Sequence, residues 1–201
     1  PELEAPPGHA RFAALAAQDG FAVRIATAPL SSAALADVSI LGLPMPTQPF
    51  TASEREAIQQ FVEAGGGLLA IGDHTDVDGT SSALNPVIGS FGVHLRFDTV
   101  WRRPDAAVPD IAAAPGPLTI GLPRWYSSVG GSLELDAGAT AVMLGGAMVF
   151  SDAGSLDADA RLGDARHGPG EPVGDLPTAA LRAQGRGRVV VLADSAALQN
   201  V

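Results

Sequence analysis

The sequence predicts a three-layer α/β sandwich with a mostly parallel sheet and an irregular insert in its second half. Two observations lead to this prediction. Residues 38–43 and 68–72 have the continuous apolar character of strands that are buried on both faces. Between them lies a helix with clear start and stop signals. A strand, a helix and a second strand in this order form a right-handed crossover unit, which is the building block of a parallel sheet.

Length and composition limit the class of protein. The chain has 201 residues, which is enough for one full core, so we expect a single domain over residues 1–201. There are 22 acidic and 12 basic residues, the formal net charge is −10 and lysine is absent, which argues against nucleic-acid binding. The absence of cysteine excludes disulfides, thiolate metal sites and a cysteine nucleophile. No apolar stretch approaches the ~20 residues that cross a bilayer, so membrane attachment would need segments outside this chain.

The first elements follow from apolar spacing. Residues 9–19 place Phe12, Leu15 and Ala16 on one helical face and stop at Gly20, which is a typical C-terminal cap. Residues 21–27 then alternate apolar and polar side chains, as a half-buried strand does. A short helical turn beginning at Ser31 or Ser32 precedes the strand at 38–43.

The helix of the crossover unit carries the clearest local signal. Thr51 and Glu54 form a capping box, in which each side chain satisfies a free backbone amide of the first turn. Ile58, Phe61 and Val62 supply the buried face, and the glycines at 65–67 end the helix. Because these glycines precede a strand, they do not have the strand-to-helix order of a phosphate-binding loop.

The second half is less regular. A polar loop at 73–80 precedes a helix at 84–91, which closes at Gly92, and a strand at 93–100. Long loops or an insert are expected at 101–130 and 151–177, the second being acidic, glycine-rich and solvated. The remaining elements that we predict are short strands at 132–135, 140–144 and 147–150, a hairpin of strands at 178–183 and 188–193, and a helix that begins at Ser195.

The polar residues that follow the strands form the candidate site, because ligands of open parallel sheets bind beyond the carboxyl ends of the strands. Asp73 and His74 follow one strand, Asp194 and Ser195 follow another, and Asp98 ends a third. If these strands are neighbours, several carboxylates and an imidazole converge at one edge. The expected ligand-binding residues are Asp73, His74, Thr75, Asp76, Asn85, Asp194 and Ser195.

Two interpretations of this edge stay open. In the first, Asp73, His74 and Asp76 hold a divalent cation, since carboxylate oxygens suit Ca²⁺ or Mg²⁺ and an imidazole extends the choice to Mn²⁺ or Zn²⁺. The spacing at 76–79 resembles part of a calcium loop, but the acidic residue required near the loop's end is missing. In the second, the aspartates bond to loop amides as Asx-turns and His74 packs over the sheet end.

Ser195 does not have the sequence context of a nucleophile. It follows Asp194 where a strand leads into a helix, but it lacks the flanking glycines of a nucleophile elbow. No histidine is related to it by spacing. The sequence therefore favours Ser195 as the N-cap of the last helix.

Four segments carry a resemblance to a known superfamily: residues 36–41 (ADVSIL), 50–58 (FTASEREAI), 61–75 (FVEAGGGLLAIGDHT) and 187–195 (GRVVVLADS). They resemble the class I glutamine amidotransferase-like superfamily, and within it the uncharacterised branch related to gliding-motility ABC-transport auxiliary proteins and intraflagellar-transport domains. The resemblance implies a flavodoxin-like fold. Amidotransferases place a cysteine on the turn where this chain has Asp73, so it also implies that glutaminase activity is absent. Such folds usually open with a strand that residues 1–7 do not supply, and we expect the chain to be part of something longer.

Together these observations lead us to expect a non-catalytic domain without a cofactor, which binds a partner protein or a small ligand around residues 73–80. The resemblance implies the soluble part of a larger, membrane-associated protein, with the extracytoplasmic side favoured. The alternative is a metal-dependent hydrolase or isomerase. In that case Asp73, His74, Asp76 and Asp194 would act as ligands or acid–base groups.

Overall fold

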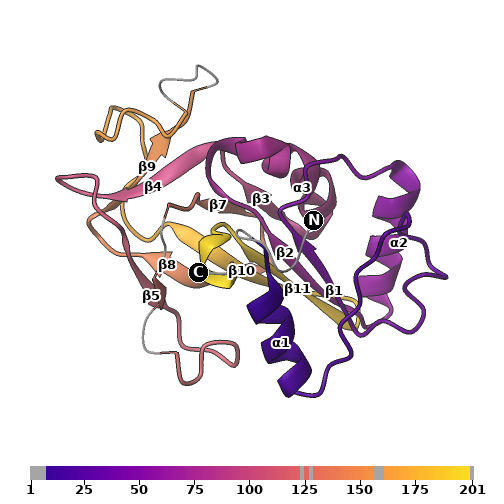
Figure 1. Ribbon diagram of the computed structural model, residues 1–201. Coiled ribbons are helices and arrows are strands. Elements are labelled where there is room, and N and C mark those ends of the chain that lie inside the picture. Colours follow the sequence, from indigo (N-terminus) through magenta and orange to yellow (C-terminus); the bar gives the residue numbers. More distant parts are fainter. Residues whose placement is uncertain (1–7, 123–124, 127–128, 156–160, 200–201) are drawn as a thin grey trace.

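The computed structural model describes residues 8–122, 125–126, 129–155 and 161–199. A seven-stranded sheet forms its centre, in the order β1-β2-β11-β10-β8-β5-β6 (Figure 1). The strands of this sheet are β1 (Ile40–Pro44), β2 (Gly67–Ile71), β5 (Asp110–Ala113), β6 (Trp125–Tyr126), β8 (Ala139–Gly145), β10 (Pro177–Gln184) and β11 (Gly187–Leu192). The helices are α1 (Ala10–Gln18), α2 (Ala52–Glu63) and α3 (Thr80–Ile88), and two small sheets pair β3 (Val93–Leu95) with β7 (Leu133–Leu135) and β4 (Asp98–Arg102) with β9 (Val149–Ala153).

The α/β class is confirmed. β1, β2 and β11 pair in parallel, with Ile40 opposite Gly67 and Val191 opposite Ala70. The pairings from β11 through β10, β8 and β5 to β6 are antiparallel, so five of the seven strands run in one direction and β10 and β5 run in the other. The strands β1, β2 and β11 form the parallel part on which the predicted site depends.

Local signals place α2 as predicted. Its N-cap hydroxyl, Thr51 Oγ1, accepts from the amide of Glu54 at 3.3 Å, and Glu54 Oε2 accepts from the amide of Thr51 at 2.9 Å. The crossover unit β1–α2–β2 is therefore present, with the capping box at its helix start.

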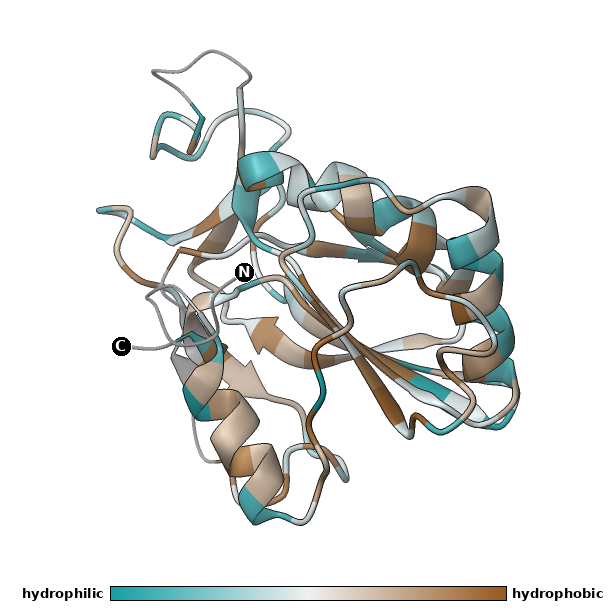
Figure 2. Ribbon diagram, turned by 45° about the vertical axis from the view of Figure 1, so that its right-hand side comes forward, coloured by the Kyte–Doolittle hydropathy of each residue, from teal (hydrophilic) through white to brown (hydrophobic). Residues whose placement is uncertain are grey.

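The main core lies between α2, α3 and one face of the parallel strands. Figures 1 and 2 place α1 and α2 on opposite sides of these strands, and Figure 2 shows apolar residues concentrated in the strands. No residue of α1 is buried, so this helix covers its side of the sheet only loosely. The core side chains include Leu41, Leu43, Ile58, Val62, Leu68, Ala70, Leu84, Val87, Ile88, Val189 and Val191.

Two expectations about the first strands are wrong. β1 is not buried on both faces, because it is an edge strand whose side chains alternate, and Ile40 is 52% exposed. Residues 21–27 form no strand, and the apolar side chains of Phe21, Val23 and Ile25 are exposed. Their alternation is that of a strand, but in the described part of the chain no neighbouring strand pairs with them. Without a ladder of backbone hydrogen bonds the segment stays irregular.

The second half contains more sheet than its composition indicates. Residues 93–100 split into β3 and β4, so Asp98 begins a strand rather than ending one. The loop expected at 101–130 contributes the end of β4 and the sheet strands β5 and β6, with Ile111 buried. The loop expected at 151–177 begins with the last residues of β9 and reaches the first residue of β10.

The other helical boundaries shift by a few residues. α3 begins at Thr80, before the predicted start, and a 3₁₀ turn at Gly89–Phe91 completes it. Ser195 precedes only a 3₁₀ turn at Ala196–Leu198, and the hairpin of β10 and β11 is confirmed. The prediction that residues 1–7 lack a strand falls outside the described residues. None of the helices in the described ranges has the length and apolar character of a membrane span.

Candidate functional site

The parallel strands bring two of the predicted site segments to one edge. β2 and β11 are neighbours, and the amide of Gly72 donates to the carbonyl of Leu192 at 2.9 Å where both strands end. Asp73 follows Gly72 directly, and Ser195 comes three residues after Leu192. The expectation that these residues crowd the same rim of the sheet matches the geometry of the chain.

A hydrogen-bonded chain connects two buried residues, Asp73 and Ser195, to the half-buried Gln199. Asp73 Oδ2 accepts from the hydroxyl of Ser195 at 2.5 Å and from its amide at 3.3 Å. The Ser195 oxygen in turn accepts from Gln199 Nε2 at 2.6 Å. Asp73 is 8% exposed and Ser195 1%, so these polar groups are satisfied by one another rather than by solvent. Ser195 therefore does not cap the turn with its side chain as expected.

Burial raises the pKa of Asp73 above its ordinary value, and the neighbouring charge of Asp194 raises it further. The hydrogen bond from Ser195 and the amide of His74, which donates to Oδ1 at 2.8 Å, act in the opposite direction by stabilising the carboxylate. Asp194 itself accepts from the amide of Ala196 at 2.9 Å.

The turn that follows Asp73 has an unusual backbone. Thr75, Asp76 and Asp78 have φ values of 40°, 51° and 54°, in the left-handed region that β-branched residues such as threonine rarely adopt. Thr75 is also 1% exposed. Its Oγ1 lies 2.7 Å from His74 Nδ1, while His74 Nε2 lies 3.8 Å from Asp73 Oδ1. Each such conformation costs of order 1–3 kcal/mol and persists only where the surroundings impose it.

Two other predicted site residues contact the polypeptide near α3. Asp76 accepts from the amide of Ser82 at 2.8 Å and from its hydroxyl at 2.6 Å. Asn85 pairs with the backbone of Leu95, donating to its carbonyl at 3.0 Å and accepting from its amide at 2.8 Å. Asp76 thus fastens the turn to the start of α3, and Asn85 fastens α3 to β3.

These contacts do not gather Asp73, His74 and Asp76 into a metal site. Among the described residues, no group of three or more His, Cys, Asp or Glu side chains is placed to hold a metal ion. All three residues lie within the described ranges, and the carboxylates of Asp73 and Asp76 accept from amides and hydroxyls instead. Both aspartates thus bond to backbone amides, as the second interpretation expects, but Asp73 bonds to the next residue and Asp76 to a residue six positions on, so neither forms an Asx-turn.

A second buried carboxylate lies behind the site. Asp98 is 3% exposed and accepts from the Ser132 amide at 2.8 Å, from the Ser132 hydroxyl, and from the Ser151 hydroxyl at 2.5 Å. Gly131 separates this cluster from the site, since a Cβ there would lie 3.2 Å from Asp98 Oδ1 and 3.3 Å from the Cα of His74. Asp98 is a candidate from the sequence alone, but its serine partners are not, because they lie 34 and 53 residues away. No local signal marks such distant partners.

Asp152, also missed, anchors the loop that follows β9. It is 1% exposed and accepts from the amides of Asp164 at 3.3 Å and Ala165 at 2.7 Å. Burial raises the pKa of Asp152 to about 6, and the charges of Glu171 and Asp164 add to this rise, against the two amide hydrogen bonds.

The raised pKa of Asp152 predicts a pH dependence of stability. The folded protein binds the proton more tightly than the unfolded chain, whose carboxyl has a pKa of 3.8. Asp152 therefore stabilises the fold most below about pH 4, and this contribution is lost as the pH rises to about 6. Between about pH 4 and pH 6 we expect the urea midpoint of the wild type to fall relative to the midpoint of Asp152→Asn. If the difference in urea midpoint between the two proteins did not change with pH, this would contradict the raised pKa of Asp152.

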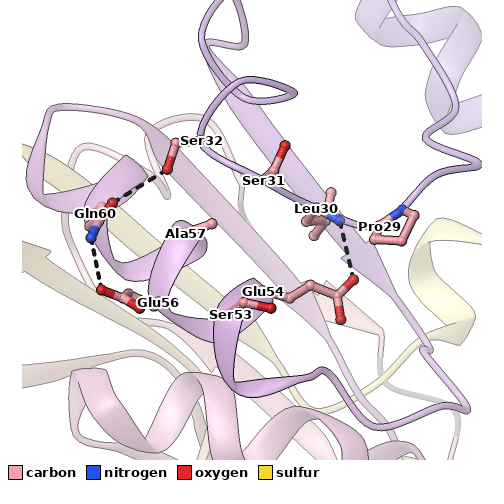
Figure 3. A pocket seen from close by; sticks show the side chains of 9 residues that line it. All are labelled: Pro29, Leu30, Ser31, Ser32, Ser53, Glu54, Glu56, Ala57 and Gln60. Atoms are coloured by element: carbon pink, nitrogen blue, oxygen red, sulfur yellow. Dashed lines mark hydrogen bonds between the residues drawn. The ribbon is translucent and has the colours of Figure 1, made fainter.

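Away from this edge, a groove of about 470 Å³ lies between residues 29–32 and α2 (Figure 3). Its polar groups bond to one another: Ser32 Oγ donates to Gln60 Oε1 at 3.4 Å, and Gln60 Nε2 donates to Glu56 Oε1 at 3.2 Å. The amide of Leu30 donates to Glu54 Oε1 at 3.1 Å. These bonds join the connecting segment to α2, and we assign the groove a structural role.

Solved structures share the fold at low sequence identity. The mmIFT52 N-terminal domain is 16% identical, with a TM-score of 0.70 over 94% of this chain and 80% of that domain. A cytoplasmic protein from Salmonella typhimurium LT2 is 13% identical, with a TM-score of 0.59 over 93% of this chain and 76% of that protein. Comparison with curated proteins gives no significant match.

At these identities the structural neighbours establish the fold alone. The family is established by a match along the sequence itself, which runs from residue 1 to residue 201. The profile that matches is a domain of unknown function, and the chain therefore belongs to the DUF4350 family.

Proposed function

We propose that this chain is a non-catalytic binding domain, and that it contacts a partner protein or small ligand through the turn at His74–Gly79. The observation that supports this is the strained backbone of the turn, which is joined through the His74 amide to the hydrogen-bonded chain of Asp73, Ser195 and Gln199. Strain of this kind persists where the surrounding structure imposes it, and it is concentrated at functional sites.

Burial of the reactive groups supports binding rather than catalysis. A serine nucleophile has to meet its substrate, but Ser195 is 1% exposed and its hydroxyl is bonded to Asp73. His74, which would be the natural general base, bonds through Nδ1 to Thr75. By contrast, the outer part of the turn is accessible, since Asp78 is exposed and Asp76 and Val77 are half-buried.

The resemblance to transport-associated domains also supports a proposal about the larger protein in which this domain works. We propose that the domain is the soluble part of a larger, membrane-associated protein. Segments outside residues 1–201 would supply the membrane attachment.

Site-specific crosslinking tests the binding proposal. A photoreactive amino acid at Val77, on the turn, is expected to crosslink one defined partner or ligand in cells of the source organism. The same group at Gln59, on the exposed side of α2, is the matched control and is expected to give no such product.

Two results would overturn the proposal. One is the absence of a product specific to position 77. The other is hydrolysis of simple ester or phosphoester substrates by the purified protein that requires a divalent cation and is lost in Asp73→Asn/His74→Ala, since this would establish the alternative metal-dependent enzyme.

A further inference from the structure

The cationic groups of this acidic chain are its twelve arginines. Some have clear partners: Arg24 pairs with Asp37 at 3.0 Å, and Arg186 Nη2 donates to a backbone carbonyl at 2.8 Å. The side chains of Arg103 and Arg166 have no hydrogen bond or ion pair with any other described residue, and Nε of Arg103 is buried. A buried donor without an acceptor is costly, so it needs an explanation.

These two arginines line the same cleft. It has a volume of about 500 Å³, and its other lining residues are Pro104, Met148 and His167. Two of the lining residues adjoin the antiparallel pair of β4 and β9, since the amide of Arg103, after β4, donates to the carbonyl of Met148, before β9, at 2.9 Å. The cleft lies beyond the end of β4, whereas Asp98, behind the candidate site, lies at the start of that strand.

His167 is held in one orientation in this cleft. Its Nε2 lies 3.1 Å from the carbonyl oxygen of Glu171, and its ring meets Phe150 edge-on with centroids 5.7 Å apart. Because a carbonyl oxygen can only accept, Nε2 carries the proton. Nδ1 is then the ring nitrogen left for a ligand.

The nearby carboxylates are occupied by the loop itself. Asp164 Oδ1 accepts from the amide of Arg166 at 2.9 Å, and Glu171 Oε2 accepts from the amide of Gly168 at 2.6 Å. The second Glu171 oxygen accepts from the amide of Ala153 at 3.0 Å. These bonds shape the loop and leave both guanidinium groups without an anionic partner among the described residues.

We propose that the cleft of Arg103, Arg166 and His167 binds a doubly charged oxyanion, the phosphate group of a small molecule. Guanidinium groups present forked donors that match phosphate oxygens, and two of them balance its charge. The side chains of Met148 and Pro104 offer an apolar surface for the uncharged part of the ligand. A nucleic acid would need an extended basic surface, which a chain of net charge −10 does not provide.

Calorimetric titration with inorganic phosphate at low ionic strength tests this proposal. We expect saturable binding at one site, weakened at least about tenfold in Arg103→Gln/Arg166→Gln, because a charged hydrogen bond contributes enough for a tenfold change. Arg188→Gln removes the same type of charge from an exposed position of β11 and is expected to leave the affinity within about twofold. Thermal melts of all variants verify the fold. If the double variant does not fold, Arg166→Gln, at an exposed position, is expected to weaken binding alone.

Three results would overturn the proposal. These are the absence of saturable phosphate binding by the wild type, an equal loss of affinity in Arg188→Gln, and acetate binding as tight as phosphate binding. The second would mean that the attraction is a diffuse effect of charge. The third would assign the cleft to singly charged carboxylates.

Discussion

Asp98→Ala is expected to lower the free energy of unfolding by about 3 to 5 kcal/mol, because it leaves several buried donors without an acceptor. In the folded protein the carboxylate accepts from the amide and the hydroxyl of Ser132 and from the hydroxyl of Ser151. Water cannot replace it easily, since Asp98 is 3% exposed and Ser132 is fully buried. Urea denaturation measures the loss as a lower midpoint at an unchanged slope.

Two variants control this experiment. Asp98→Asn keeps the size of the side chain and one acceptor oxygen, so its loss is expected to be smaller. Asp105→Ala removes an exposed carboxylate from the turn after β4 and is expected to change stability by less than about 0.5 kcal/mol. A loss below about 1 kcal/mol for Asp98→Ala would show that the cluster is not a structural anchor.

Gly187→Ala is expected to destabilise the protein by about 3 kcal/mol, at the upper end of the cost of overpacking a well-filled interior. A Cβ at this position would lie 2.1 Å from the carbonyl oxygen of Val62 and 2.3 Å from that of Gly66. Both atoms belong to the backbone, so neither can rotate away. The end of α2 and the start of β11 would have to move apart. The expected drop in melting temperature is roughly 6 to 12 °C for a chain of this size.

Gly42→Ala is the matched control, because it is the same substitution in another strand of the same sheet. A Cβ at Gly42 meets no atom within 4 Å. We expect a change in stability of less than about 0.5 kcal/mol, with a small gain from the stiffer unfolded chain. Equal effects at the two glycines would contradict the close backbone approach at Gly187.

The elements that sequence analysis placed correctly are those with local causes. The capping box joins Thr51 and Glu54, which are only three positions apart, so the sequence pattern alone identifies the hydrogen bonds that form in the folded helix. The strands β2 and β11 were identified because their apolar runs reflect burial in the interior of the sheet. From these two strands the shared edge of Asp73 and Ser195 followed directly.

The predictions fail where the pairing of strands that are distant in sequence decides the structure. Residues 21–27 alternate as a strand should but find no partner strand among the described residues, whereas β5, in a segment rich in proline and alanine, pairs with both β6 and β8. Apolar alternation predicts a pleated conformation and does not say whether a neighbour exists. The serines around Asp98 and the link from Asp73 to Ser195, which spans 122 residues, depend on the same long-range contacts.

The position of β11 in the sheet has a consequence for biosynthesis. It is the last strand in the described part of the chain, yet it lies between β2 and β10, with parallel pairing on one side and antiparallel pairing on the other. β10 and β11 are joined by a tight turn and pair locally, whereas β2 lies far earlier in the chain and lacks this neighbour until β11 has been made. Contacts so distant in sequence form slowly, because a long loop must close first. The edge of β2 that faces β11 therefore stays unpaired until the hairpin of β10 and β11 docks against it, and it is at this stage that a chaperone would be most effective.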